Sequence, residues 1–421
     1  MASFALFRLP REQACTLMIQ REGEPQELAN LTELNRKSGF VIAPFAVTHQ
    51  QPVLLLHPDE QQQMELGEVD SVKAEIEEMI TANEESYDRS HAFYKNGEQP
   101  LSGDMARMRY RIDFANFHAH LCDGAFRKIV LARSTFDKNP ENKNYAADLF
   151  CMACRLYPRM FVSLVSTKKS GTWMMATPEI LLDGKGTDWR TIALAGTMKL
   201  ENHQLGFDSI GDGIEDRSNG TEDRSDGTED RSNTAEYLSN STEDRSDATA
   251  TANADGHQMS EILWDQKNIQ EQRYVATYIT ECLERFSHRM QEEGPYTVRA
   301  ANLVHLRSDF NFQLDDCSRI GTLLKALHPT PAVCGLPKDD TFDFIIHNES
   351  SPRTYYSGFT GMLNPEAGTH LYVSLRCMHI RKDGYMLYAG GGLLADSIEE
   401  QEWEETEAKM ETMRNIIYRA R

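Results

Sequence analysis

Residues that could do acid–base chemistry gather near the C-terminus, just after three consecutive glycines. The run GGG at 390–392 follows an apolar stretch, and Glu402, Glu405 and Lys409 come soon after it. Side chains three or four positions apart share one face of a helix, so these three can act together. Glycines at such a junction would let an anionic group approach backbone N–H donors. Taken alone, the pattern also fits a solvated acidic helix with one ion pair.

Two cations stand inside strand-like apolar runs, where burial of a charge is costly unless it is paired or neutral. Lys128 lies in FRKIVLARS at 126–134, and the two-residue alternation of a strand places it on the same face as Val130. Arg376 lies in the middle of LYVSLRCMHI at 371–380. Lys128 also fits a charged residue that protects an edge strand from aggregation. A charge within an apolar run is nevertheless the informative exception.

The composition of the 421 residues is that of a globular protein, with 40% hydrophobic and 9% aromatic residues. The net charge of −21 argues against nucleic-acid partners and anionic membranes. Cys151 and Cys154 form a CxxC within an apolar run, without a second pair, so we expect buried core thiols rather than a metal site. No secretory leader or long apolar run is present, which predicts a soluble cytoplasmic protein.

Apolar periodicity predicts the elements that must position these residues. Short strands of a single sheet are expected over residues 1–70, followed by a helix at 70–96. Further helices are predicted at 105–121 and 262–287, and further strands at 126–134, 161–166, 172–176, 180–182, 192–197, 354–362, 371–380 and 385–389. The strand at 192–197 is expected to run into a glycine turn.

A seven-residue acidic repeat interrupts this pattern. IEDRSNG at 214–220 is followed by TEDRSDG, TEDRSNT and, after a gap, TEDRSDA. No position is consistently apolar, so the repeat is not a coiled-coil heptad. Such a segment buries too little surface to offset its chain entropy. We therefore expect residues 207–258 to form a disordered surface loop, more plausibly a tolerated repeat expansion than a binding element.

Nine motifs, in this order, resemble the chorismate-utilising enzymes, and most closely the isochorismate synthases among them. They are FRKIVLAR, TPEILL, LAGT, KNIQEQRYV, LHPTPAVCGLP, YYSGFTGM, SLRCMHI, YAGGGLL and EWEETEAK. The resemblance implies a large α+β fold with two facing antiparallel β-sheets, helices packed outside and the active site in the cleft between. The catalytic region would span 105–421, interrupted by the repeat, and 1–104 would be a strand-rich part of the same fold.

The family reaction adds water at C2 of chorismate, removes the C4 hydroxyl and shifts the ring diene. By their matching positions, Lys128 is implied as the general base, which must be neutral part of the time. Glu179 is implied as the general acid, and its apolar neighbours favour the protonated form. Glu271 and Glu405 match the two glutamates that hold Mg²⁺, with Glu402 as an outer carboxylate.

The resemblance also implies the residues that bind chorismate. Arg376 matches the residue that clamps the enolpyruvyl carboxylate, for which the fork of a guanidinium is suited. The remaining implied binding residues are Gly196, Thr197, His305, Ala332, Tyr356, Gly390, Gly391, Gly392 and Lys409.

Single residues help to distinguish between the related activities of these enzymes. Lys128 stands where anthranilate synthases typically lack a lysine, and Ala195 stands where some aminodeoxychorismate synthases carry a nucleophilic lysine. We therefore expect no glutaminase subunit, and a monomer or weak dimer. The preferred function is isochorismate synthase, for menaquinone rather than siderophore synthesis. Salicylate synthase, with a further loss of pyruvate, and a non-catalytic chorismate-binding or scaffold protein are the alternatives.

Overall fold

The structure is a computed structural model that describes residues 2–90, 103–138, 145–199, 263–300 and 303–420. The chain divides into two units, the first formed by 1–200 with 264–421 and the second by 201–263. Apart from Leu263, the described residues all belong to the first unit. The predicted loop at 207–258 lies outside the described residues.

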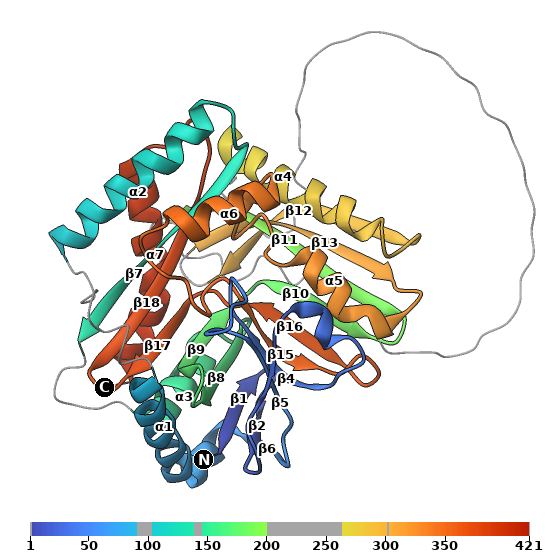
Figure 1. Cartoon of the computed structure of the whole chain (residues 1–421), viewed down its shortest axis with the longest axis vertical. Coiled ribbons are helices and arrows are strands. Elements are labelled where there is room, and N and C mark those ends of the chain that lie inside the picture. The colour runs from blue at the N-terminus through green and yellow to red at the C-terminus, as the bar shows by residue number, and fades with distance from the viewer. Residues whose placement is uncertain (1, 91–102, 139–144, 200–262, 301–302, 421) are drawn as a thin grey trace, which may run out of the picture. The chain divides into compact units, whose positions relative to one another are not determined.

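Two antiparallel sheets of nine strands each make up the centre of this unit (Figure 1). The β7 sheet has the strand order β14 (Gly335–Leu336), β7 (Lys128–Lys138), β18 (Gly384–Leu393), β17 (Cys377–Arg381), β9 (Gly171–Thr177), β8 (Phe161–Thr167), β1 (Ser3–Arg8), β2 (Ala14–Gln20), β6 (Glu60–Glu65). The β11 sheet has the order β12 (Met290–Ala300), β13 (Leu303–Gln313), β11 (Asp188–Lys199), β10 (Ile180–Lys185), β16 (Thr369–Val373), β15 (Phe359–Leu363), β4 (Gly39–Ala43), β5 (Val53–Leu56), β3 (Gln26–Leu28).

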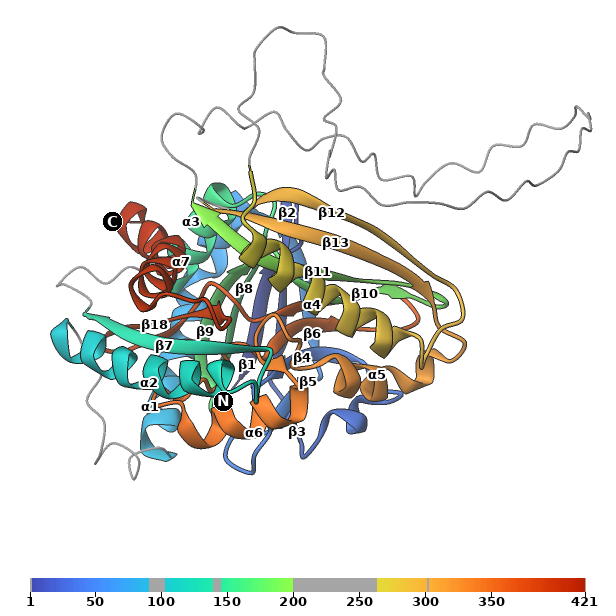
Figure 2. The ribbon, with the colours of Figure 1, turned by 90° about the horizontal axis from the view of Figure 1, so that it is seen from above.

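Seven α-helices in the described residues cover these sheets (Figures 1 and 2). They are α1 (Val69–Ser90), α2 (Asp104–Cys122), α3 (Ala146–Leu156), α4 (Gln266–Leu283), α5 (Ile320–Leu327), α6 (Lys338–Asn348) and α7 (Glu399–Arg419). Helices α1, α3 and α7 share one apolar cluster with the β7 sheet, while α4 and α5 share another with the β11 sheet. Helices α2 and α6 pack on the β7 and β18 edge. This α+β architecture confirms the predicted fold class.

A third apolar cluster lies between the two sheets, and it explains why many strands are apolar on both faces. On β1, Phe4 and Leu6 face the helices, whereas Ala5 and Phe7 face the other sheet. The ring of Phe161 on β8 stacks on a tyrosine of the β11 sheet, with centroids 4.3 Å apart. Each strand therefore buries both rows of its alternating side chains.

The structure corrects several predictions about individual elements, beginning with these three. The strands of residues 1–70 do not form one sheet, because β1, β2 and β6 join the β7 sheet while β3, β4 and β5 join the β11 sheet. Helix 262–287 is shorter than expected: Asp265 caps α4 through the Asn268 amide, and the helix ends at Leu283. The predicted strand 354–362 begins only at Phe359. Local periodicity does not say which sheet a strand joins, or where a cap ends a helix.

Candidate active site

A cavity with an empty volume of about 630 Å³, partly open to solvent, collects most of the predicted site residues. The walls come from both sheets, from α4 and α7, and from the turns before β14 and β15. The predicted residues that line it are Glu179, Gly196, Thr197, Glu271, His305, Ala332, Tyr356, Arg376, Gly390, Gly392 and Lys409. Segments far apart in the sequence thus meet at one place.

Glu179 is the acidic group in the cavity with the most perturbed protonation. It follows β9 and precedes β10, and its side chain is buried. Burial raises the pKa of Glu179 to about 8, against opposing effects of Lys128, Lys409 and Arg376. A carboxyl group with this pKa carries its proton at neutral pH and can donate it.

Lys128 lies at the start of β7 and is fully buried. Its Nζ lies 3.0 Å from Glu271 Oε1, in an ion pair between strand and helix. Val130 lines the cavity, whereas Ile129 and Leu131 pack beneath α2 and α6, which confirms the predicted alternation along this strand. Burial would raise the pKa of Glu271, but Lys128 and Lys267 outweigh burial and lower it. Glu271 is therefore an ionised carboxylate.

The three glycines do not form a strand–helix junction as expected, because β18 continues through them to Leu393. They pair with β7, Gly390 opposite Ala132 and Gly392 opposite Val130. Side chains occupy the space that a Cβ would need. A Cβ on Gly392 would come 2.2 Å from Glu271 Oε1. The glycines thus make room for acidic side chains beside the strand.

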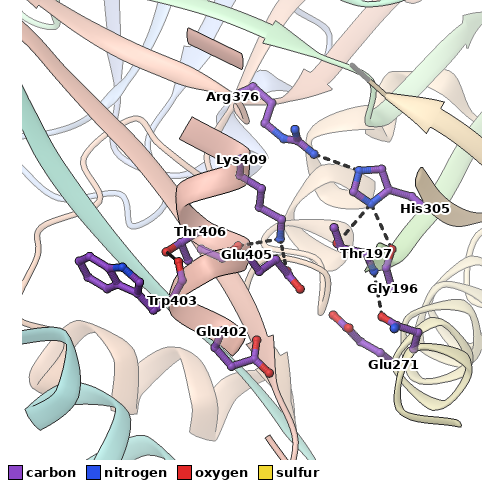
Figure 3. A network of polar contacts seen from close by, with 12 residues as sticks. Gly196, Thr197, Glu271, His305, Arg376, Glu402, Trp403, Glu405, Thr406 and Lys409 are labelled. Atoms are coloured by element: carbon purple, nitrogen blue, oxygen red, sulfur yellow. Dashed lines mark hydrogen bonds and ion pairs between the residues drawn. The ribbon is translucent and has the colours of Figure 1, made fainter. Parts of the chain in front are cut away.

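Helix α7 brings its acidic residues to the same strand, as the spacing predicted. Glu402 and Glu405 both approach Gly391, at 3.1 and 3.8 Å from the position of a Cβ. Lys409 Nζ donates to Gly390 O at 2.8 Å and to Glu405 Oε1 at 2.6 Å (Figure 3). Glu402 forms an ion pair with Lys267 of α4. Burial and the nearby Glu405 raise the pKa of Glu402 to about 7.

The opposite wall of the cavity holds Arg376 and His305. Arg376 donates through Nη2 to His305 Nε2 at 2.9 Å (Figure 3). A guanidinium has no acceptor, so the proton of the imidazole is on Nδ1, which donates to Gly196 O at 3.1 Å. Burial, with the charges of Arg376 and Lys409, lowers the pKa of His305 well below its usual value. His305 is therefore a neutral acceptor that orients the guanidinium.

Arg376 is not in the middle of a strand, which corrects the prediction for 371–380. Strand β16 ends at Val373 and β17 begins at Cys377, and Arg376 has a φ of 46° between them. Left-handed backbone in a residue with a long side chain costs free energy, and such strain gathers at functional sites. The break turns Arg376 into the cavity instead of leaving it in the alternation of a strand.

Strand β11 also departs from the predicted glycine turn, because it continues past Gly196 to Lys199. The register shifts between Ala195 and Thr197, and Gly196 has a φ of 72°. The bulge is fixed to α4, since the Thr197 amide donates to Asn268 Oδ1 at 2.9 Å. A bulge re-aims the backbone, and here it directs the Gly196 carbonyl to His305.

Comparison with known proteins shows the family to which the chain belongs. A model of the chorismate binding enzyme family matches residues 20–415. The chain belongs to the chorismate binding enzymes. Isochorismate synthase DhbC of Bacillus subtilis is 28% identical over 302 residues, which cover 70% of this chain and 64% of that enzyme. The chain thus aligns with slightly less than two thirds of the relative's length.

Solved structures of this family share the fold. The DhbC protein of Bacillus anthracis superposes with a TM-score of 0.68 at 18% identity, over 99% of this chain and 96% of that one. MenF, the menaquinone-specific isochorismate synthase of Escherichia coli, gives 0.67 at 19% identity, over 99% and 88%. Among the described residues, no helix is long and apolar enough to cross a membrane.

A chorismate binding enzyme that uses Mg²⁺ needs oxygen ligands, and this chain offers them. The carboxylates of Glu271 and Glu405 point toward a common space from α4 and α7 (Figure 3). Glu402 Oε2 is buried and has no hydrogen-bond partner in the described part of the chain. No three His, Cys, Asp or Glu side chains of the described residues converge on one point. Two carboxylates, with waters as the remaining ligands, are a donor set that suits Mg²⁺.

Two structural contacts around the site were missed from the sequence. The first is the buried ion pair Glu349–Arg353, with its charged atoms 2.6 Å apart, which links β7 to the turn before β14. Arg353 donates to Val333 O at 2.6 Å and to Val130 O at 2.8 Å, and Glu349 accepts from the Ala132 amide at 2.7 Å. The four-residue spacing of a glutamate and an arginine was the available signal. It is too common on surfaces to indicate a buried pair.

The second missed contact sets the position of α7. Trp403 contacts two guanidinium groups, that of Arg133 of β7 at 3.6 Å and that of Arg107 of α2 at 4.7 Å from a centroid of its rings. Arg133 Nε also donates to Thr406 Oγ1 at 2.7 Å. Cation–π contacts of this kind are strongest when they are desolvated. They fix the turn of α7 that carries Glu402 and Glu405.

Proposed function

We propose that this chain is an isochorismate synthase, which converts chorismate to isochorismate. The observation that carries the proposal is a buried lysine and a protonated carboxyl at one site: Glu179 lines the cavity, and Lys128 lies just behind its wall in an ion pair with the lining residue Glu271. The charge of Lys128 is the strongest influence opposing the raised pKa of Glu179, so the two groups lie within electrostatic reach. An acid and a base held apart in one buried site are what addition of water and departure of a hydroxyl require.

In the proposed reaction, Lys128 first loses its ammonium proton to solvent, and the neutral amine then accepts a proton from the water that adds at C2. Glu179 gives its proton to the C4 hydroxyl as that group leaves, and the ring diene shifts. Arg376 binds one substrate carboxylate through its guanidinium, and His305 holds the guanidinium in its orientation. Mg²⁺, when bound by Glu271 and Glu405, supplies a positive charge that draws the other carboxylate and orients the ring.

Two residues support water as the nucleophile. Lys128 occupies the position at which aminating relatives typically lack a lysine, and Ala195 provides no amine at the position where some relatives carry a nucleophilic lysine. Loss of pyruvate to give salicylate remains the second candidate, because it uses the same lysine and glutamates. Menaquinone synthesis is the proposed destination of the product.

A product assay tests this proposal. Purified protein is incubated with chorismate and Mg²⁺, and the products are separated by chromatography. We expect isochorismate, its loss when EDTA is added, and its loss in Lys128→Ala with Mg²⁺ present. Salicylate and pyruvate would move the chain to the second candidate. No conversion by the folded protein, with chorismate binding retained, would support a non-catalytic role and overturn the proposal.

A further inference from the structure

Helix α2 carries two apolar faces, and among the residues that the structure describes only one of them packs against other elements. Tyr110, Phe114, Phe117 and Leu121 pack inward against β7 and α6. Figures 1 and 2 both show α2 at the margin of the described unit, beside β7. Six residues on the opposite side are exposed, and we call them the outer stripe of α2: Met105, Met108, Ile112, Ala115, Ala119 and Cys122.

The outer stripe has the spacing of a helix–helix seam. Its intervals are 3, 4, 3, 4 and 3 residues, which are those of the a and d positions of a heptad. The three large members are strongly exposed, Met105 and Met108 at 60% and Ile112 at 58%. Isolated exposed apolar residues are ordinary, but a continuous stripe with this period along a whole helix marks an interaction surface.

We propose that the outer stripe binds the outer stripe of a second copy of this chain, antiparallel, about a two-fold axis between Ile112 and Ala115. The sizes of the side chains support this orientation. In an antiparallel pair each a position meets a d position, and every large residue then faces a small one. The layers are Met105 with Cys122, Met108 with Ala119, and Ile112 with Ala115, each formed twice.

A parallel pair would give poorer packing. Methionine and isoleucine would then face their own kind in the N-terminal half, and alanine and cysteine theirs in the C-terminal half, so one half would be crowded and the other loosely packed. Charge is also compatible with the antiparallel pair. Arg109 flanks the stripe opposite Asn116 of the second copy, and Arg111 flanks it opposite His118, so no two arginines meet. Among occupants of an apolar helix face, a copy of this chain therefore fits best.

The proposed contact is small. Helix α2 has 19 residues, about 28 Å of helix at 1.5 Å per residue. One such helix pair buries less than the roughly 1,200–2,000 Å² of a standard stable interface. Association should therefore be weak, with dimers present at high protein concentration and monomers at low concentration.

Cysteine cross-linking tests the pairing without disturbing the core. Only the antiparallel pair places residue 105 of one copy beside Cys122 of the other. We expect Met105→Cys to give a disulfide-linked dimer under mild oxidation, seen on a non-reducing gel. The wild type, and the double variant Met105→Cys with Cys122→Ser, should stay monomeric on that gel. Efficient cross-linking of either control would indicate parallel pairing and overturn the proposal.

A charge exchange gives an independent measurement by sedimentation velocity. Ile112→Lys alone and Ala115→Glu alone should each lower dimer formation at least tenfold. The double variant should recover it, because each lysine then faces a glutamate of the other copy. All three should keep wild-type circular dichroism and turnover. A wild type that stays monomeric at several hundred micromolar protein, or a double variant without recovery, would refute the proposed dimer.

Discussion

The two ends of the cavity hold their charges in opposite ways. At the α7 end the three glutamates, buried or half-buried, each have a lysine: Glu271 with Lys128, Glu405 with Lys409, and Glu402 with Lys267. At the other end Arg376 is buried, and within the described residues its side-chain hydrogen-bond partners are the uncharged groups of His305 and Thr412. Its nearest polar partner is the neutral ring of His305. One end is neutralised internally, and the other keeps an uncompensated cation.

This difference assigns separate tasks to the two ends. A buried charge without a partner is costly, and burial lowers the pKa of Arg376 to about 10, which leaves it charged at neutral pH. An anionic ligand would supply the missing countercharge, so this end is suited to binding. At the paired end, a glutamate can change its cationic partner without leaving a buried charge unpaired. This end is therefore suited to proton transfer and to holding a metal ion.

The largest expected effect comes from removing the amine at the paired end. Lys128→Ala should lower kcat by about 10²–10⁴-fold, the range for loss of a general base. The dissociation constant for chorismate should change little, because Arg376 is intact. Turnover and calorimetric binding are the measurements. A parallel loss of binding would show that Lys128 holds the cavity together instead of reacting.

Glu179 gives the expected pH dependence. Because its pKa is raised to about 8, the acid form is present below that pH and is lost as the pH rises through it. The rate of the wild type should therefore fall on the alkaline side with a midpoint near 8. Glu179→Gln should lower kcat by about 10²-fold or more and remove this limb. An unchanged alkaline limb in the variant would assign the titration to another group.

The binding end is tested by changing its geometry while keeping its charge. Arg376→Lys should raise KM for chorismate about tenfold and leave kcat within a few-fold, since a lysine lacks the bidentate fork. The matched control is Arg381→Lys, an arginine at the far end of β17 that does not line the cavity. If kcat fell more than KM rose, Arg376 would belong with the proton-transfer end.

The smallest expected effect concerns the repeat. Deletion of 208–256 should leave kcat and KM within about a few-fold, because this polar segment has the composition of chain that cannot form a packed core. It joins β11 and α4, which carry cavity residues of both ends, so activity is a sensitive readout. Collapse of activity in a folded deletion variant would contradict the prediction that the repeat is a tolerated expansion.

The sequence predicted which residues meet at the cavity better than it predicted the backbone that carries them. Glu402, Glu405 and Lys409 lie together because a helix repeats every 3.6 residues, which is local information. The break that turns Arg376 inward, the bulge at Gly196 and the course of β18 through the glycines were all missed. Each depends on contacts with a segment distant in the sequence, such as Asn268 against the bulge.

Helix α2 also separates what local sequence predicts from what distant contacts decide. Its apolar periodicity predicted a helix at 105–121, and α2 spans Asp104–Cys122. With apolar residues on two sides, the pattern alone did not say which side faces the core. Packing on β7 and α6 decided that, and so defined the outer stripe.

By itself, the sequence determined the fold class and the family, since motif order is written in the chain, and it supplied the side chains proposed for the site. Only the tertiary structure decided how those groups are charged. A carboxyl or imidazole takes its protonation state from burial and from its neighbours, and in this protein those neighbours come from distant strands and helices. The neutral His305, the protonated Glu179 and the ionised Glu271 are properties of the folded cavity.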